Sequence, residues 1–308
     1  MESCSFAGHP SWQLSDTVFK DRLMKQIRVW WGTANAKYFP GPQPVSIERK
    51  DFDTLRNHPY WVCYKSDGVR YLFVCVRVDN RNYSLFVNRK MDMFLTKITT
   101  ATTVFNGTVL DGELVYNRET KQHEYVVYDA TIVGGQSVTQ KPLSARLDAA
   151  TSVVSHITRS DIPIKIKLFF PLRDFQDYVN DIVPDITHGL DGYVFTPEDS
   201  PVMSGTHYHM FKWKEQLKNT VDFRVEHRKN RRGYVLYLSK GKSLYEVSDT
   251  LTHPPMKKVP CIVECRYAGP HKWTPVLVRE DKSHPNNYLT YTKTLYNIQE
   301  NIQLEEFY

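Results

Sequence analysis

Apolar and polar positions repeat with different periods along the chain, and these periods predict its elements. Residues 16–31 place apolar side chains three or four apart, which is typical of an amphipathic helix, and Ser15 is placed to cap it. From residue 60 the pattern becomes extended, and Asp79-Asn80 between two apolar runs indicates a hairpin. Up to residue 213 we expect strands at 71–76, 83–87, 108–116, 124–132, 192–195 and 208–213, and helices near 142–147 and 173–182.

The second part of the chain has a different pattern. After about residue 220, five short apolar runs follow one another with no helix between them, which is typical of a small closed barrel of the OB type. These runs are 222–227, 233–239, 244–247, 260–266 and 273–279, and 288–306 is predicted to be a closing helix. Residues 39–44, FPGPQP, are expected to be a loop because of their prolines. The prediction is an α+β fold, with antiparallel sheets and flanking helices before a boundary near Thr220 and an OB-fold β-barrel after it.

Composition narrows the class of protein further. The 308 residues suggest about two domains, and 40 Lys and Arg against 34 Asp and Glu give a net charge of +6, compatible with a polyanionic partner. No secretory signal and no apolar run long enough to cross a membrane is visible. The five cysteines are scattered and odd in number, which favours an intracellular, reducing compartment.

The strongest local signal is the stretch 65–70, KSDGVR, which follows an apolar run. Asp-Gly is ordinary turn chemistry, so a charged β-turn explains the stretch as well. The alternative is that Lys65 is a nucleophile at a strand end and that Arg70 binds the substrate. Lysine attacks only in its neutral form, which burial and nearby cations favour.

Further charged residues stand where strands are predicted. Asp-Gly recurs in 111–113 and at Asp191, and carboxylates in such positions can hold Mg²⁺ or a ribose hydroxyl. Lys212 and Lys214 alternate with apolar residues, so they share one strand face, which is either solvated or aimed at phosphate.

Other possible sites are weaker. The glycines before 241–243, GKS, are too far apart for a P-loop, and Cys261 with Cys265 lacks the second half of a zinc site. The basic stretch 227–233 is either a solvated hairpin tip or a contact to RNA phosphates.

Taken in order, these motifs resemble those of the lysine-dependent nucleotidyltransferase superfamily, which contains mRNA guanylyltransferases and polynucleotide ligases. The stretches that carry the resemblance are 65–70 (KSDGVR), 111–113 (DGE), 126–129 (VVYD), 191–195 (DGYVF), 212–214 (KWK) and 279–282 (REDK). The resemblance runs from about Pro40 to the C-terminus.

Three features point to the mRNA capping branch of the superfamily. They are KWK followed by 219–223 (NTVDF), Trp273 ahead of the last motif, and 39–52 (FPGPQPVSIERKDF) combined with the ending 289–302. This combination is similar to the compact, single-function guanylyltransferase of large DNA viruses that infect algae. Ser66 departs from the threonine that many members carry, but it keeps the hydroxyl.

The resemblance implies that Lys65 attacks the α-phosphorus of GTP and forms a lysyl–GMP intermediate. The GMP then passes to the 5′-diphosphate end of RNA to form the GpppN cap. It also implies a nucleotidyltransferase domain at 1–220, an OB-fold domain at 221–302, and a tail at 303–308 that returns to the first domain. Residues Arg279, Asp281 and Lys282 would then touch the leaving pyrophosphate only when the domains close.

The same resemblance assigns the remaining roles. Tyr128 would stack on guanine, Lys167 and Ser66 would reach its O6, and Asp191 would hold Mg²⁺ or Mn²⁺. The implied GTP-binding residues are Ser66, Arg70, Arg89, Glu113, Tyr128, Lys167, Lys212, Lys214, Asp222, Arg279, Asp281 and Lys282.

The implied partners are GTP and 5′-diphosphate RNA. RNA triphosphatase, cap methyltransferase and RNA polymerase would be separate chains, and the protein would be a viral monomer in the host nucleus or cytoplasm. Two alternatives stay open: an ATP-dependent polynucleotide ligase of the same superfamily, and a non-catalytic OB-fold protein that binds RNA.

Overall fold

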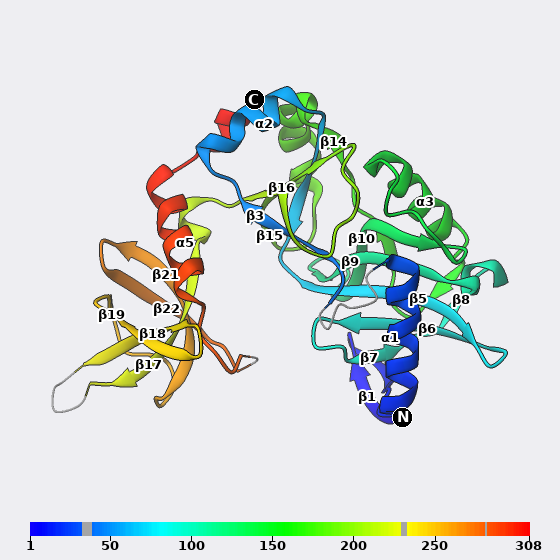
Figure 1. Ribbon diagram of the computed structural model, residues 1–308, viewed down its shortest axis with the longest axis horizontal. Helices are drawn as coiled ribbons and strands as arrows, with labels where there is room; N and C mark the ends of the chain where they lie inside the picture. The colour runs from blue at the N-terminus through cyan, green and yellow to red at the C-terminus, as the bar shows by residue number, and fades with distance from the viewer. Residues whose placement is uncertain (33–38, 229–232, 281) are drawn as a thin grey trace. The chain divides into compact units, whose positions relative to one another are not determined.

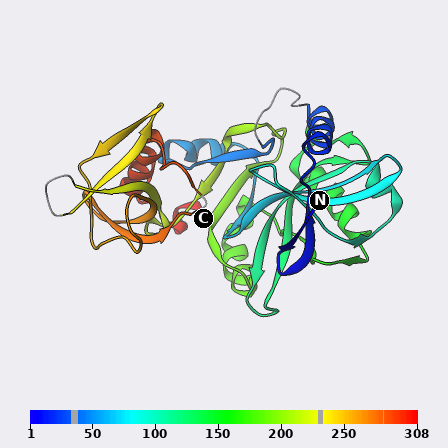
Figure 2. The same ribbon diagram turned by 90° about the horizontal axis from the view of Figure 1, so that it is seen from below.

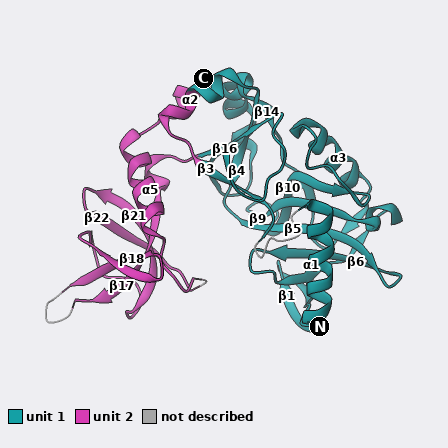
Figure 3. Ribbon diagram, in the orientation of Figure 1, with its two compact units in different colours: residues 1–45, 53–212, 308 teal, residues 46–52, 213–307 magenta. Residues whose placement is uncertain are grey.

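The computed structural model describes residues 1–32, 39–228, 233–280 and 282–308. The chain divides into two compact units (Figure 3), the first made of residues 1–45, 53–212 and 308, and the second of 46–52 and 213–307. Each unit has its own hydrophobic core, so each is described by itself.

Helices are few and mostly short. The α-helices are α1 Thr17–Trp31, α2 Phe52–Asn57, α3 Leu143–Ser155, α4 Phe175–Asp177 and α5 Tyr288–Glu300. Asp16 caps α1 by accepting the Phe19 N–H at 3.0 Å, so the expectation that Ser15 caps it is wrong. None of the helices in the part of the chain that the structure describes is long and apolar enough to cross a membrane.

Short helical turns fill several connections. They are the 3₁₀ turns η1 Arg49–Asp51, η2 Thr102–Asn106, η3 Leu172–Asp174, η5 Val183–Asp185, η6 Gln216–Lys218 and η7 Leu304–Phe307, and the π turn η4 Tyr178–Ile182. The single helix expected near 173–182 is therefore replaced by η3, α4 and η4 in succession.

Three β-sheets form the framework of the first unit (Figure 1). A nine-stranded sheet has the order β1 (Glu2–Phe6), β2 (His9–Gln13), β7 (Met93–Leu95), β6 (Arg81–Asn88), β5 (Val69–Val78), β9 (Thr108–Asn117), β10 (Gln122–Val133) and β11 (Gln136–Ser137), with β13 (Ile164–Ile166) also pairing with β10. A five-stranded sheet has the order β14 (Phe170–Pro171), β4 (Tyr60–Ser66), β15 (Leu190–Pro197), β16 (Gly205–Trp213) and β3 (Pro42–Ser46). A small sheet pairs β12 (Arg159–Ser160) with β8 (Ile98–Thr99).

Both faces of the nine-stranded sheet are buried. Along β5, Tyr71 and Phe73 point into one core cluster and Leu72 and Val74 into the other. Helix α1 packs on the second cluster and α3 on the first, so the sheet lies between them (Figures 1 and 2). The uninterrupted apolar run of β5 follows from this double burial.

The proline-rich segment is only partly a loop. Strand β3 begins at Pro42 and pairs with β16 at the edge of the five-stranded sheet. The expectation of a loop throughout 39–44 is wrong because an edge strand needs hydrogen bonds on one side only, which tolerates Pro42 and Pro44.

The second unit is built on a six-stranded sheet. Its order is β19 (Ser243–Val247), β18 (Tyr234–Lys240), β17 (Thr220–His227), β21 (Cys261–Gly269), β22 (Lys272–Val278) and β20 (Thr250–Leu251). Among the described residues β19 and β20 do not pair, so the sheet is open and the expected closed barrel is not formed. The reason is that β20 is only two residues long and pairs in parallel with β22.

Helix α5 is tied to this sheet by one buried carboxylate. Asp249 accepts hydrogen bonds from Trp273 Nε1 at 2.6 Å and Tyr291 Oη at 2.7 Å. Trp273 is fully buried and packs edge-on against Phe223, which places it at the centre of the core.

Candidate functional site

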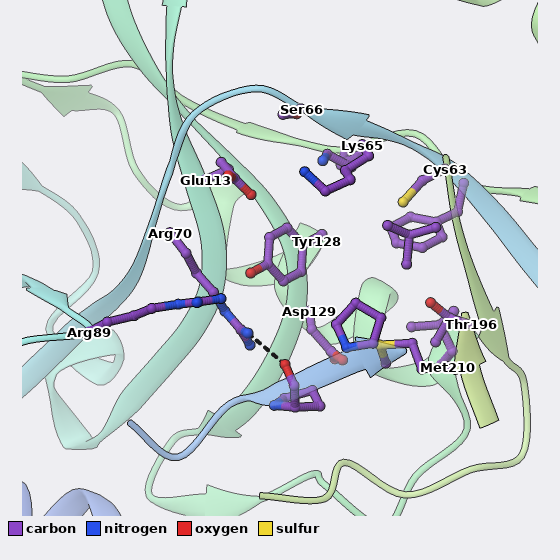
Figure 4. A pocket seen from close by; sticks show the side chains of 16 residues that line it. Cys63, Lys65, Ser66, Arg70, Arg89, Glu113, Tyr128, Asp129, Thr196 and Met210 are labelled. Carbon is purple, nitrogen blue, oxygen red and sulfur yellow. Dashed lines mark hydrogen bonds between the residues drawn. The ribbon is translucent and has the colours of Figure 1, made fainter. Parts of the chain in front are cut away.

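A pocket in the first unit gathers much of the predicted site (Figure 4). Its volume is about 160 Å³, and its walls come from β3, β4, β5, β9, β10, β15 and β16, the start of α3 and connecting segments. The predicted residues that line it are Lys65, Ser66, Arg70, Arg89, Glu113, Tyr128 and Lys167. The other lining residues are Pro42, Pro44, Cys63, Asp129, Leu143, Phe169, Val194, Thr196 and Met210.

Lys65 and Asp191 form an ion pair at the pocket, with 2.9 Å between Nζ and Oδ2. Strand β15 pairs with β4 through Leu190 and Tyr193, but the register shifts between these two residues, opposite Lys65. Gly192 has a φ of 102°, which side chains rarely adopt. The bulge therefore turns the Asp191 carboxylate towards the lysine.

Arg70 is held by its neighbours on several sides. Its Nε donates to Asp111 Oδ1 at 2.9 Å, Nη2 donates to Oδ2 of the same carboxylate, and Nη1 donates to the Pro42 carbonyl at 2.6 Å. A Cβ on Gly41 would lie 2.1 Å from Arg70 Nη2, so only glycine allows this close approach. Arg70 is thus fixed in direction, and it pairs across the strands with Glu113.

Tyr128 enters the site through a second irregularity. The register of β9 and β10 shifts between Val127 and Asp129, so Tyr128 is the extra residue of a bulge. Its hydroxyl donates to Asp111 Oδ1 at 2.9 Å, and the Arg70 guanidinium lies 5.7 Å from its ring centroid. Burial raises the pKa of Tyr128 well above its ordinary value, so the hydroxyl stays a donor.

Lys167 brings a second amine to the pocket. It is only 4 % exposed, donates to the Tyr64 carbonyl at 3.2 Å, and lies 4.7 Å and 5.3 Å from the rings of Tyr64 and Tyr128. Burial lowers the pKa of Lys167, and the positive charge of Lys65 lowers it further, although Glu113 acts in the opposite direction.

The charges around the pocket favour an anionic ligand. Burial raises the pKa of Glu113, which the positive charges of Lys167, Lys65 and Arg70 oppose. Arg89 is exposed and points to the pocket beside Arg70 (Figure 4). Among the residues that line the pocket, four cations stand against the two carboxylates Glu113 and Asp129, and two of the cations are paired with Asp191 and Asp111 at its edge. The apolar wall strengthens the effect of these cations on a phosphate.

Ser66 is almost inaccessible, at 1 % exposed, and its Oγ lies 3.1 Å from Nε2 of His188. Sequence patterns did not single out His188, because it stands alone between Thr187 and Gly189 without a recognisable spacing. The apolar lining was also missed, since Val194 and Met210 look like ordinary strand residues.

Several predicted residues do not line this pocket. Lys212 lies in β16 and Lys214 just after it, and both are half-buried beside the buried Phe211 and Trp213. Asp281 lies outside the described residues.

The remaining predicted residues form a charged cluster in the second unit. Asp222 accepts from Arg279 Nη1 at 3.3 Å and pairs with Lys282, and Glu264 pairs with Arg279 at 3.2 Å. Asp222 is 4 % exposed, so this carboxylate holds both cations in place from the sheet.

Two carboxylates near Lys65 could bind a metal ion. Asp191 is paired with the lysine, and Glu113 is close enough for its charge to interact with it. Among the residues the structure describes there is no cluster of three or more His, Cys, Asp or Glu side chains that could hold a metal by themselves. This donor set suits Mg²⁺, which binds to one or two carboxylates and takes its other ligands from phosphates and water.

Two family models together match residues 13–308 of the chain. The family model described as "mRNA capping enzyme, catalytic domain" matches residues 13–216, and "mRNA capping enzyme, C-terminal domain" matches 213–308. The chain is 28 % identical over 336 residues to the mRNA-capping enzyme subunit alpha of Schizosaccharomyces pombe, covering 94 % of this chain and 82 % of that protein.

Two other relatives are matched over a smaller part of their length. The mRNA-capping enzyme subunit alpha of Saccharomyces cerevisiae is 31 % identical over 68 % of this chain and 52 % of its own length. The mRNA-capping enzyme of Danio rerio is 27 % identical over 82 % of this chain and 46 % of its own length. The chain therefore spans about half the length of the Saccharomyces cerevisiae and Danio rerio proteins, and more of the Schizosaccharomyces pombe protein.

Among solved structures, a mycobacterial DNA ligase D complexed with ATP and MES overlaps at a TM-score of 0.43 and 13 % identity, covering 73 % of this chain and 90 % of the ligase chain. We draw nothing from a likeness at this level.

Proposed function

Because the chain belongs to the mRNA capping enzyme family, we propose that it is an mRNA guanylyltransferase that transfers GMP from GTP to the 5′-diphosphate end of RNA. The observation that carries the proposal is the position of Lys65. Its amine lies at a pocket shared with Arg70, Arg89 and Lys167, and the side chain is only 27 % exposed.

The proposed first step makes a covalent lysyl–GMP. The lone pair of neutral Lys65 Nζ attacks the α-phosphorus of GTP, a P–N bond forms, and the bond to the β-phosphate oxygen breaks. Pyrophosphate leaves with that electron pair, and the surplus proton on nitrogen passes to solvent. In the second step an oxygen of the RNA diphosphate attacks the same phosphorus, and the P–N bond breaks. The lysine nitrogen keeps the electron pair of that bond and takes up a proton from solvent, so the lysine is regenerated.

The pocket residues are proposed to bind the nucleoside. Tyr128 offers a ring face for guanine, held in direction by the Asp111 carboxylate. Lys167 and Ser66 are proposed to reach the guanine O6, Glu113 and Arg70 to contact the ribose, and Arg89 to bind GTP beside them. The Arg70 guanidinium is also bound to Asp111, so we infer that it fixes the wall of the pocket as well.

We propose that a divalent cation, Mg²⁺ or Mn²⁺, is bound with GTP. Asp191 would hold it, and Glu113 is placed to assist. When bound, such an ion neutralises phosphate charge and favours departure of pyrophosphate.

The remaining assignments rest on the motif resemblance. Lys212 and Lys214 are proposed to bind the α-phosphate, and Arg279, Asp281 and Lys282 to contact the leaving pyrophosphate. Asp222 is proposed to belong to the GTP-binding residues. We also propose a nucleotidyltransferase domain at 1–220, an OB-type domain with an open sheet at 221–302, and a tail at 303–308.

Partners and source are proposed on the same basis. The RNA triphosphatase, cap methyltransferase and RNA polymerase would be separate chains, and the protein would act as a monomer. The relatives named above are cellular proteins, so a viral source stays a prediction.

The deciding experiment is label transfer from α-labelled GTP with a divalent cation, followed by peptide mapping. We expect an acid-labile adduct on Lys65, no adduct with Lys65→Ala, and an unchanged adduct with Lys25→Ala, an exposed lysine of α1. Preferential transfer from ATP would favour a polynucleotide ligase. Failure of the wild-type protein to form any adduct would favour a non-catalytic RNA-binding protein, and an acid-stable adduct would exclude lysine as the attachment site.

A further inference from the structure

A basic groove on the second unit contains cations to which the chemistry proposed above gives no role. Its volume is about 430 Å³, and its walls come from β17, β21, β22, the segment before β21 and the segment after β22. Arg224, Lys257 and Lys258 line it beside Arg279 and Lys282. None of the described residues that line it carries an aromatic ring. Such a groove suits the phosphates of a chain rather than its bases.

The least exposed cations of the groove are already held by carboxylates. Arg279 and Lys282 pair with Asp222, whose side chain is only 6 % exposed. Arg224 pairs with Glu226 at 2.6 Å. These three cations are therefore partly neutralised, and they fix the inner wall of the groove.

The two lysines before β21 are more accessible. Lys257 pairs with Glu280 at 2.7 Å, and these side chains are 56 % and 73 % exposed. An exposed pair contributes little free energy, so a phosphate can replace the carboxylate at small cost. Lys258 is exposed beside Lys257 and lines the same groove. Both lysines are thus placed to bind successive phosphates of one chain.

An aromatic pair on the same unit carries a further cation. The ring centroids of Tyr245 and Tyr288 lie 5.0 Å apart, and Lys240 Nζ lies 4.9 Å and 5.2 Å from them. Tyr245 is 40 % exposed, and Lys240 is exposed as well. Surfaces that bind single-stranded nucleic acid combine rings on which bases stack with cations for the phosphates.

The segment 282–288 joins the groove to the aromatic pair. It begins with a lining residue of the groove and ends at Tyr288, so the Cα atoms of its ends lie at most about 22 Å apart. Asn286 is fixed between them, because its Oδ1 accepts the Asp222 N–H at 2.8 Å and its carbonyl accepts the Ser239 N–H at 2.9 Å. The groove and the rings are therefore neighbours within one unit.

We propose that the groove and the aromatic pair form one binding surface for single-stranded RNA, the acceptor of the GMP. Phosphates of the RNA bind to Lys257 and Lys258, and a base stacks on Tyr245. The choice of RNA as the occupant rests on the proposed function, in which RNA is the second substrate. An acidic peptide would use the cations but would not need the rings.

The test is fluorescence anisotropy of a short labelled single-stranded RNA with a 5′-diphosphate, bound to the full chain over a range of salt concentrations. For Lys257→Ala combined with Lys258→Ala we expect weaker binding. The slope of log K against log salt should be smaller by about 1.4, or about 0.7 for each lost phosphate contact. Tyr245→Ala should weaken binding about fivefold or more at an unchanged slope, and Tyr245→Phe should bind normally.

Two further variants sharpen the test. Glu280→Gln removes a negative charge from the groove and frees Lys257, so it should bind the RNA more tightly than the wild type. Lys272→Ala, which changes an exposed lysine of β22 outside the groove, is the control and should bind normally. All the substituted side chains are exposed, so the variants should fold.

Unchanged RNA affinity in the double lysine variant or in Tyr245→Ala would overturn the inference. Competition by poly-glutamate as strong as that by unlabelled RNA would also overturn it, because the surface would then bind any polyanion. If the double lysine variant loses only GMP adduct formation, the groove serves GTP and the inference is wrong. If the wild type binds the RNA in the expected way but forms no GMP adduct, the proposed function fails and the RNA-binding surface stands.

Discussion

Arg70 shows how one residue links the fold to the pocket. It is 9 % exposed, and its partner Asp111 is 1 % exposed, so the pair is deeply buried. The carboxylate also accepts the Tyr128 hydroxyl, and the guanidinium lies 5.0 Å from the ring centroid of Phe39. Removal of the arginine would leave a buried carboxylate without its main partner.

We therefore expect Arg70→Ala to lower the free energy of unfolding by about 3–5 kcal/mol, as for other buried pairs that lose one partner. The measurement is urea unfolding at neutral pH, followed through the first unit. Arg77→Ala is the matched control, because Arg77 lies on the same strand but is exposed, and it should change stability by at most about 0.5 kcal/mol. Equal losses for the two variants would mean that the buried pair is not the cause.

His188 predicts a dependence of stability on acid pH. Its pKa falls from 6.5 to about 4 on folding, mainly through burial, so between these values the unfolded chain binds a proton that the folded chain does not. The contribution of the neutral imidazole to stability is complete above pH 6.5 and is lost as the pH falls towards 4. The free energy of unfolding falls by about 3 kcal/mol in total over this range.

The measurement is the free energy of unfolding at several pH values for the wild type and His188→Gln. The difference between the two proteins should change between pH 6.5 and 4 and be constant above that window. Parallel curves would show that the imidazole is not the group that titrates.

At the scale of single residues, sequence reasoning found side chains that carry a motif and missed those that support them. Lys65, Arg70 and Glu113 stand in short charged stretches, so their types and order were informative. His188 and Ser66 become partners only because β4 and the segment that leads into β15 meet in space. A contact between residues 122 positions apart leaves no local pattern.

At the scale of elements, two bulges shape the pocket. Tyr128 is the extra residue in β10, and Asp191-Gly192 is the irregular step in β15. A regular strand would send one of each pair of neighbouring side chains away from the pocket. The bulges therefore place a ring and a carboxylate beside strands that are otherwise regular.

Gly192→Ala tests the importance of the second bulge. With a φ of 102°, alanine is strained there, so we expect the strand to relax and Asp191 to turn away from Lys65. Adduct formation should fall at least about tenfold, since small misplacements in a reacting site are costly. Gly134→Ala is the control, because its φ of 61° is also positive and strains alanine, but Gly134 does not line the pocket. A normal adduct rate for Gly192→Ala would show that the bulge is not required.

Strands and helices could be predicted from the sequence where a single period of apolar residues dominates. The apolar run of β5 and the Asp79-Asn80 turn were read from the sequence, and both turn residues have positive φ values of 49° and 61°. The edge strand β3 was missed because its prolines point to a loop, and only its position beside β16 makes it a strand. The open sheet was missed because strand spacing does not reveal whether the last strand meets the first.

At the scale of the molecule, the two units have separate cores, and the chain passes between them more than once. Residues 46–52 belong to the second unit, where Arg49 pairs with Glu306 and Phe52 stacks on Phe307 at 5.2 Å. Unfolding is therefore not expected to be a single two-state transition. All residues that line the pocket belong to the first unit. GTP binding to the pocket and the role of the charged cluster of Asp222, Arg279 and Lys282 can therefore be measured separately.

Lys282→Ala makes use of this separation. In our proposal GTP binds in the pocket of the first unit. At about 100 times its Kd, GTP should therefore stabilise that unit by about 2.7 kcal/mol, both in Lys282→Ala and in Lys65→Ala. The variant should nevertheless fail to form the GMP adduct, because Lys282 is proposed to act on the leaving pyrophosphate. Calorimetry with and without GTP, together with label transfer, checks both parts.

Lys293→Ala, which changes an exposed lysine of α5, is the control and should bind GTP and form the adduct normally. Loss of the GTP-induced shift in Lys282→Ala would mean that the cluster already binds GTP before reaction, and a normal adduct would remove it from the chemistry altogether.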